Sequence, residues 1–384
     1  SYGTSTLVLT LLATQMGGFS TLGKVQSIFS DGLIMSAAAI GYPISYLFLA
    51  FFVAPRLERF EGCLTLGDVM GRLYGPTSKW VTGVVGFVYS SIIVASQMLA
   101  LSFVCTSLLQ LEKGWAVVLG GSIITFYSAF GGVKSVAKTD IIQFGMLIVM
   151  IPILATVVTN HTGGISGIFQ QLPATKLEVF SHPKFNEYLV FFLVWTLFPA
   201  GRLDPPCMQR ILMAKSGKQV RSMYMTGAAL VPAFELMIMF IGLGAFIAYP
   251  NIKSVNPTLH IIENLLPLGV KGMATAGLFA VIMSTGDSFM NSAGIMLTHD
   301  VTKPLSNKLS IKFDELIFVK VATLVLGTAA AFVAYKSTSI VKLFLYSTAL
   351  LGPLTTIPLI AGIMGLKTDA KTFFTAFFTT LAAF

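Results

Sequence analysis

The stretch ATQMGGFS at residues 13–20 interrupts an apolar run that extends from about residue 3 to about residue 23. A membrane-spanning helix needs about 20 mostly apolar residues, so this run is long enough to cross a bilayer. Two adjacent glycines, Gly17 and Gly18, would lie near mid-depth and weaken the helix there. A second interrupted run, at about 187–205, contains the sequence PAG at 199–201. Both interruptions predict spanning helices that are broken inside the membrane.

The remaining apolar runs give these two breaks matching positions in the chain. We expect spans at about 3–23, 32–54, 75–110, 114–131, 138–160, 187–205, 221–249, 270–298, 314–335 and 338–366, and the start of a truncated further helix at 370–384. The broken spans are then the first and the sixth. This predicts a single transmembrane domain over 1–384 with two five-span repeats, at about 3–160 and 187–366. Because five is odd, the second repeat runs inverted through the membrane, as in many secondary transporters.

The composition excludes an ordinary soluble enzyme, a coiled coil and a disordered chain. Hydrophobic residues make up 55% of the sequence and charged residues only 11%, whereas soluble domains average about 25% charged residues. The runs are continuous rather than alternating, which excludes a membrane β-barrel pattern. The sequence therefore predicts an all-α polytopic protein surrounded by a lipid bilayer. The net charge of +9 is explained by basic loops that face an anionic leaflet, and we expect no nucleic-acid partner.

Transport fits the sequence better than catalysis does. The three cysteines and four histidines have no disulfide or metal-ligand spacing, and we find no phosphate loop and no Ser/His/Asp set. We therefore expect no enzymatic activity and no bound metal apart from sodium. Paired Gly/Pro-interrupted spans at matching positions of two repeats are a sequence pointer to a transporter's binding site.

The eighth span offers oxygen atoms for a hard cation beside the broken first helix. Broken helices expose backbone carbonyls that need partners in the membrane, and sodium prefers neutral oxygen ligands. Val281, Ser284 and Thr285 lie on one helical face by their i, i+3, i+4 spacing. Their two hydroxyls and one carbonyl could bind sodium. Alternatively, the hydroxyls bond only to carbonyls of their own or a neighbouring helix.

Several stretches of the sequence resemble motifs of the sodium/solute symporter family, which includes proline permease and the sodium–sugar symporters. They are ATQMGG at 13–18, PRLER at 55–59 with LTLGD at 64–68 and RLYGP at 72–76, GGVKSVAKTDIIQ at 131–143, and AVIMST at 280–285 followed by Asn291-Ser292. The resemblance implies a sodium ion bound by the carbonyls of Ala13, Met16 and Val281 and the hydroxyls of Ser284 and Thr285. It also implies a multi-pass protein of the cell membrane, which we expect to be a bacterial inner membrane.

Acidic residues within or beside the spans require a separate interpretation. For Asp140, at the predicted start of the fifth span, the resemblance implies a station on the sodium exit path, and a helix N-cap is the alternative. Asp287 could act on the same exit path. We expect Asp204 to pair with Arg202, and Glu235 to be either a neutral carboxyl bonded to a neighbour or a proton-coupling group. Gln15 replaces an aspartate that is important for sodium binding in proline permease.

The solute site is expected near the bilayer midplane, between the two breaks and the facing sides of the third and tenth spans. The candidate residues for solute binding are Gln15, Gly17, Gly18, Ser20, Gln97, Trp195, Tyr346 and Ser347. For each of them, helix packing is the alternative explanation.

The function predicted from the sequence is sodium-coupled import of a small organic solute by alternating access, with an amino acid such as proline as the best candidate. Two alternatives remain open at this point. The chain could be the transporter-like sensor domain of a membrane histidine kinase, or a proton-coupled symporter.

Overall fold

The computed structural model describes residues 2–197, 199–252, 255–310, 312, 314–366 and 369–383, without the side chains of 132–135, 137, 200 and 383. Within these residues the regular structure is entirely helical. Eight of the described helices are long and apolar enough to cross a membrane. The two broken spans are not among the eight, because each of their halves is too short. The prediction of an all-α polytopic membrane protein is confirmed.

The first half of the chain contains the predicted first to fifth spans. The first span consists of α1 (Thr4–Gln15), η1 (Phe19–Gly23) and α2 (Lys24–Asp31), and the second of α3 (Leu33–Ala38), α4 (Gly41–Phe48), η2 (Leu49–Val53) and η3 (Ala54–Phe60). They are followed by α5 (Leu66–Tyr74), α6 (Pro76–Leu108) and α7 (Lys113–His161).

Helix α7 differs from the sequence prediction, which placed a loop between the fourth and fifth spans. The backbone is helical without interruption from Lys113 to His161, through the Gly131-Gly132 pair. The two apolar segments that could cross the membrane, Lys113–Gly131 and Lys138–His161, are therefore joined by helical backbone. Glycine permits helical dihedral angles as readily as turn angles, so the pair alone does not force a loop. Of the motif at 131–143, the side chains of 132–135 and 137 lie outside the described residues.

The second half contains the predicted sixth to tenth spans and their connections. These are α10 (Phe185–Leu197), η4 (Ala200–Arg202), α11 (Pro205–Leu212), α12 (Gly217–Ala248), α14 (Leu268–Met296) with η5 (Leu297–Thr302) and α15 (Lys303–Leu309), α16 (Glu315–Lys336), and α17 (Ile340–Leu351) with η6 (Gly352–Thr356) and α18 (Ile357–Met364). The short connecting helices are α8 (Gly164–Gln171), α9 (Ala174–Leu177) and α13 (Pro257–Leu265). Of the predicted final segment 370–384, α19 (Ala370–Ala383) is described and residue 384 is not.

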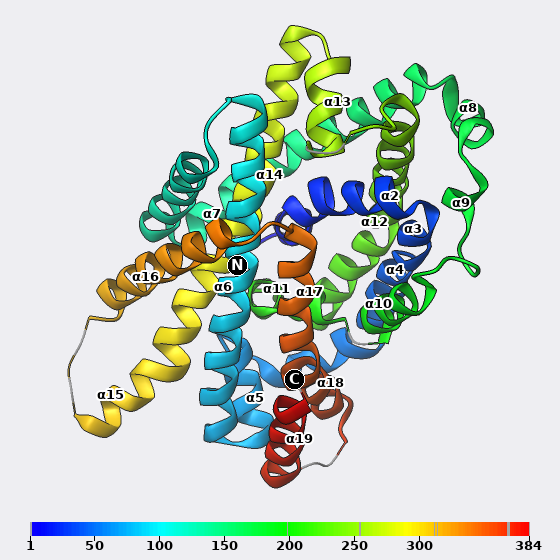
Figure 1. Cartoon of the computed structure of the whole chain (residues 1–384). Coiled ribbons are helices and arrows are strands. Elements are labelled where there is room, and N and C mark those ends of the chain that lie inside the picture. Colours follow the sequence, from blue (N-terminus) through cyan, green and yellow to red (C-terminus); the bar gives the residue numbers. More distant parts are fainter. Residues whose placement is uncertain are drawn as a thin grey trace.

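The long helices α6 and α14 run through the middle of the molecule, with the broken first span beside them (Figure 1). Helices α8 and α13 lie at one end of the molecule, and α5 and α19 lie at the other (Figure 1).

Two glycines allow the break of the first span to pack directly on α6 and α14. A Cβ at Gly18 would lie 2.4 Å from the Cβ of Ala100 on α6. A Cβ at Gly17 would lie 2.5 Å from Oγ1 of Thr285 on α14. Both separations are far below van der Waals contact, so a larger residue at either position would push the break away from its neighbours. The glycines thus set how closely the first span approaches the centre.

Gly227 of α12 has a similar role against Tyr46 of α4, whose side chain is completely buried. A Cβ at Gly227 would lie 2.4 Å from Cε1 of the Tyr46 ring. The ring fills the space that the glycine leaves free, and it also meets the ring of Tyr224, on the same helix as Gly227, edge-on at 5.9 Å.

Replacing Gly227 by alanine is expected to destabilise the fold by about 1–3 kcal/mol, because the Tyr46 ring must move in a close-packed interior. The measurement is thermal unfolding of the purified protein in detergent. Gly272→Ala on α14 is the control, because a Cβ there meets nothing within 4 Å and alanine favours a helix. Equal stability of Gly227→Ala and the wild type would contradict the packing argument.

Candidate functional site

The break of the first span leaves backbone carbonyls without hydrogen bonds. Helix α1 ends at Gln15, and Met16, with φ −97° and ψ 69°, leaves the helical conformation. The Met16 amide still donates to the Leu12 carbonyl at 3.1 Å. Among the described residues, no backbone amide donates to the carbonyls of Ala13 or Met16. These two oxygens are therefore available to another partner.

Thr285 of α14 lies directly against this break. Its Oγ1 donates to the Thr14 carbonyl at 3.0 Å and lies 3.5 Å from the carbonyl of Val281, one turn earlier in α14. The structure thus brings α1 and α14 together at the residues that the sequence selected. Thr285 contacts carbonyls of both its own and the neighbouring helix, as expected if its hydroxyl serves only in helix packing. The same position is also where a hydroxyl ligand of a cation bound at the break would lie.

Ser284 points into a buried polar network on the next part of the same helix face. Its Oγ donates to Asp140 Oδ1 at 2.5 Å. Asp140 Oδ2 accepts from Arg210 at 3.0 Å, and Arg210 also donates to Ser288 Oγ at 2.7 Å. Asp140 lies well inside α7, so the N-cap alternative is wrong: the backbone amides that a cap would serve are already in the helix.

Asp287 adjoins this network and is fully buried, yet neither of its side-chain oxygens has a hydrogen-bond partner among the described residues. Buried polar groups are usually paired, and a buried carboxylate without a partner is expensive. The unsatisfied oxygens mark a place where a cation could be received.

Gln15 connects the break of the first span to the break of the sixth. Its Nε2 donates to the carbonyl of Gly201 at 2.6 Å and to Cys207 Sγ at 3.1 Å. Its Oε1 accepts from the Tyr46 hydroxyl at 2.7 Å. A neutral amide can both donate and accept, which an aspartate at this position could not do. The substitution noted in the sequence therefore gives Gln15 a cross-linking role.

The break of the sixth span contains a helix cap rather than the predicted ion pair between Arg202 and Asp204. Asp204 Oδ1 accepts from the Cys207 amide at 3.0 Å and caps α11, while Tyr89 donates to its other oxygen at 3.4 Å. Among the described residues, no ion pair involves Arg202 or Asp204. That expectation is wrong because the carboxylate is drawn to the orphan amide at the helix start.

A cavity of about 60 Å³ lies between the two breaks. It exceeds the roughly 10–15 Å³ that a water molecule needs. Its wall includes five of the residues predicted to bind solute, which are Gln15, Gly17, Ser20, Gln97 and Trp195, and also Met16 and Thr285 from the predicted sodium site. Residues from α4, α6, α12 and α17 complete the wall.

Three of the predicted solute-binding residues do not line this cavity. The Gly18 amide instead donates to Gln97 Oε1 at 2.8 Å. Ser347 is buried and donates to the Phe344 carbonyl at 2.7 Å, whereas the Tyr346 side chain is 64% exposed. Phe344 is the residue of α17 that faces the cavity.

A row of aromatic rings covers part of the cavity. Phe344 stacks on Phe19 of η1 with ring centroids 3.8 Å apart, and on Trp195 of α10 with centroids 5.4 Å apart. Tyr42 of α4 meets the Trp195 ring edge-on at 5.0 Å. The stack joins elements from four spans and gives the cavity an apolar wall.

No role was assigned to Lys24 from the sequence. Lys24 is only 3% exposed, lines the cavity and forms an ion pair with Glu235 of α12. The sequence left Glu235 as either a neutral carboxyl bonded to a neighbour or a proton-coupling group. The ion pair with Lys24 explains how a glutamate is tolerated inside the seventh span. A lysine at the very edge of the first span was the only sequence signal.

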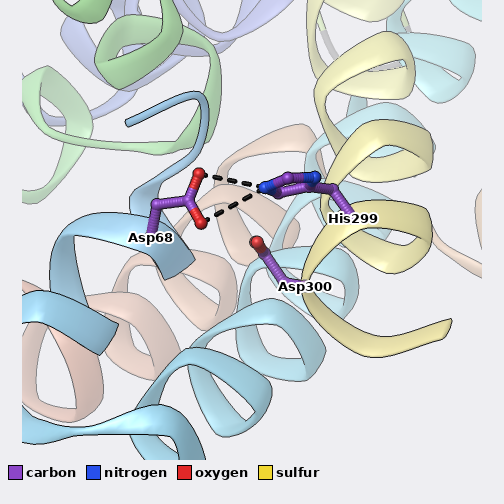
Figure 2. Close-up of side chains that lie close together, drawn as sticks. All are labelled: Asp68, His299 and Asp300. Atoms are coloured by element: carbon purple, nitrogen blue, oxygen red, sulfur yellow. Dashed lines mark hydrogen bonds and ion pairs between the residues drawn. The ribbon is translucent and has the colours of Figure 1, made fainter. Parts of the chain in front are cut away.

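A separate cluster of charged side chains lies near the end that holds α5. Figure 2 shows Asp68 of α5 facing His299, with Asp300 below them. His299 Nε2 lies 3.2 Å and 3.1 Å from the two Asp68 oxygens. Their donor atoms and that of Asp300 lie within 4.8 Å of one another, a spacing that could hold a metal ion. However, the Lys79 ammonium lies 2.7 Å from Asp68 and 3.7 Å from Asp300, so it already supplies a positive charge between the carboxylates.

The same contacts control the protonation of Asp68. Burial alone would raise its pKa, but hydrogen bonds from His299, Lys79 and the Leu64 amide outweigh burial and hold the pKa of Asp68 well below its usual range. The cluster therefore acts as a charged link between α5, α6 and the end of α14.

The sequence of this chain is similar to those of known membrane transporters. A profile of the sodium:solute symporter family matches residues 1–379. The chain belongs to the sodium:solute symporter family. The sodium/proline symporter of Staphylococcus aureus is 28% identical over 340 residues, which are 84% of this chain and 66% of that protein. The high-affinity choline transporter 1 of Drosophila melanogaster is 23% identical over 354 residues, which are 88% of this chain and 56% of that protein.

The fold is shared with a solved transporter of the same broad class. The substrate-bound outward-open structure of a sodium-coupled sialic acid symporter superposes with a TM-score of 0.78 at 17% identity, covering 96% of this chain and 80% of that chain. This similarity confirms the five-plus-five inverted-repeat transporter fold with broken first and sixth helices. The chain spans about two thirds of the length of the staphylococcal relative.

Replacing Asp68 by asparagine is expected to lower stability at pH 7 by about 1–3 kcal/mol, because its charged hydrogen bonds are lost. Since the folded pKa is depressed, the carboxylate contributes fully above the unfolded value of about 3.9 and loses its contribution as the pH falls below it. The difference between wild type and variant in thermal unfolding should therefore shrink from pH 7 to pH 3.5.

The control is Asp314→Asn at the exposed N-cap of α16, where asparagine caps as well as aspartate. A wild-type advantage over Asp68→Asn that grows on acidification would contradict the assignment.

Proposed function

We propose that this protein is a sodium-coupled secondary transporter that imports a small organic solute by alternating access. One observation carries the proposal. The carbonyls of Ala13 and Met16 lack backbone donors at the point where Thr285 of α14 reaches the broken helix. Neutral oxygens from two helices converge there, which is the ligand type that hard cations take.

The sodium ligands in this proposal are the carbonyls of Ala13, Met16 and Val281 and the hydroxyls of Ser284 and Thr285. On binding, the ion would take over the free carbonyls and hold α1 against α14. An ion that binds one arrangement of these helices more tightly than the other shifts the equilibrium between them. The solute cavity shares Met16 and Thr285 with this site, so the sodium ion and the solute would contact the same two helices.

The exit path for sodium in this proposal follows Ser284 to Asp140 and Asp287. Ser284 already donates to Asp140, and the oxygens of Asp287 have no hydrogen-bond partner. Arg210 pairs with Asp140 on its other oxygen. The ion would therefore compete with Arg210 for Asp140, which prevents the carboxylate from holding it tightly.

The solute class follows from the relatives and from the cavity. The name of the staphylococcal relative specifies proline, so a small amino acid is the leading candidate. The aromatic stack of Phe344 with Phe19 and Trp195 offers a surface for an apolar side chain or ring. A small cavity with one apolar wall suits such a molecule better than a polymer.

The test replaces Thr285 by alanine and measures proline uptake into proteoliposomes against external sodium. Loss of one ligand to a charged ion should raise the sodium concentration for half-maximal uptake by about tenfold or more. Ser284→Ala should act in the same direction.

Thr298→Ala is a matched control, because Thr298 is also buried and its hydroxyl bonds only to the Gly294 carbonyl at 2.7 Å. An unchanged sodium dependence in both Ser284→Ala and Thr285→Ala would refute the ion site. Uptake driven by a pH gradient in sodium-free buffer would refute sodium coupling in favour of proton coupling.

A further inference from the structure

Arg202 lies between the two halves of the sixth span, in the wall of the central cavity. Its side chain is held almost entirely away from solvent, since the residue is only 5% exposed. A guanidinium is always charged and carries five N–H donors in a rigid planar fork. A residue of this kind in a membrane interior needs acceptors, or its burial is costly.

The described residues supply no acceptor to this guanidinium. Within this part of the chain no ion pair involves Arg202, no atom accepts a hydrogen bond from its side chain, and its Nε is enclosed without a partner. The carboxylates that line the cavity are already engaged. Glu235 pairs with Lys24, and Asp204 caps α11 and receives Tyr89.

Aromatic rings surround the cation instead. The guanidinium carbon lies 4.4 Å from the ring centroid of Tyr42, 4.9 Å from that of Tyr46 and 5.1 Å from that of Trp195. Ring faces attract a cation and fix its position, but they leave its planar N–H groups unbonded. The arrangement holds Arg202 in place while its terminal N–H groups, unlike the enclosed Nε, stay free for a ligand in the cavity.

We propose that the transported solute carries a carboxylate and that Arg202 binds it through charge-assisted hydrogen bonds. The inference rests on the proposed function only in taking the central cavity as the solute site. A carboxylate matches the fork of a guanidinium with two parallel hydrogen bonds. The apolar part of the solute then lies towards the Phe344 and Trp195 rings. Neutral sugars and cations such as choline lack the group that Arg202 requires.

The test is a thermal-shift titration of the purified protein in detergent, with and without sodium. The panel contains the twenty common amino acids, short monocarboxylates, the carboxamide of each carboxylate, choline and glucose. Stabilisation is expected from at least one carboxylate, and its carboxamide should bind at least tenfold more weakly. Arg202→Gln should weaken binding of that carboxylate by about 10–100-fold, and Arg202→Lys, which keeps the charge without the fork, by less.

Arg221→Gln is the matched control, since Arg221 stacks on Phe51 at 4.8 Å and does not line the cavity. The shift produced by sodium alone shows that each variant is folded and reports separately on the ion site. Equal binding of a carboxylate and its carboxamide, binding confined to choline or glucose, no stabilisation by any carboxylate, or an unchanged affinity in Arg202→Gln would each overturn the proposal. None of these results bears on the sodium dependence of uptake, which Thr285→Ala tests. The proposed solute group and the proposed sodium site can therefore fail independently.

Discussion

The structure depends on one constraint: backbone groups inside a membrane have no water to bond, so a broken helix must find other partners. In this protein the partners come from different spans. Gln97 accepts from the Gly18 amide, Thr285 donates to the Thr14 carbonyl, and Gln15 reaches the Gly201 carbonyl. Each of these hydrogen bonds therefore satisfies a backbone group and also links two helices. The breaks are the places where the separate spans of the bundle are joined.

Buried charged side chains also need partners inside the membrane, and two pairs of them satisfy each other. Lys24 pairs with Glu235, and Asp140 pairs with Arg210. Arg202 makes no hydrogen bond or ion pair through its side chain with the described residues, and neither oxygen of the Asp287 carboxyl has a hydrogen-bond partner among them. One is a cation in the solute cavity, and the other is a carboxylate beyond the proposed ion site. These two unsatisfied groups lie beside the proposed solute site and the proposed sodium path, where a moving ion or solute could satisfy them.

The sequence predicted the spans and breaks because apolar run length and Gly/Pro interruptions are local properties. It also selected the face of α14 that lies against the break of the first span, since helical spacing fixes which residues lie together. It could not show that α7 continues through Gly131-Gly132, because glycine allows either conformation. It could not pair Lys24 with Glu235, since periodicity does not reveal which helices become neighbours. The rotation of α17, which turns Phe344 rather than Tyr346 to the cavity, is likewise set by packing.

The aromatic stack has a consequence for how the spans can move relative to one another. Phe344 is the middle ring of the stack. One neighbour, Phe19, belongs to η1 in the first half of the chain, and the other, Trp195, belongs to α10 in the second half. Because one side chain makes both contacts, a movement of α17 away from η1 and α10 separates both ring pairs together. Phe344 therefore couples the position of the tenth span to those of the first and the sixth.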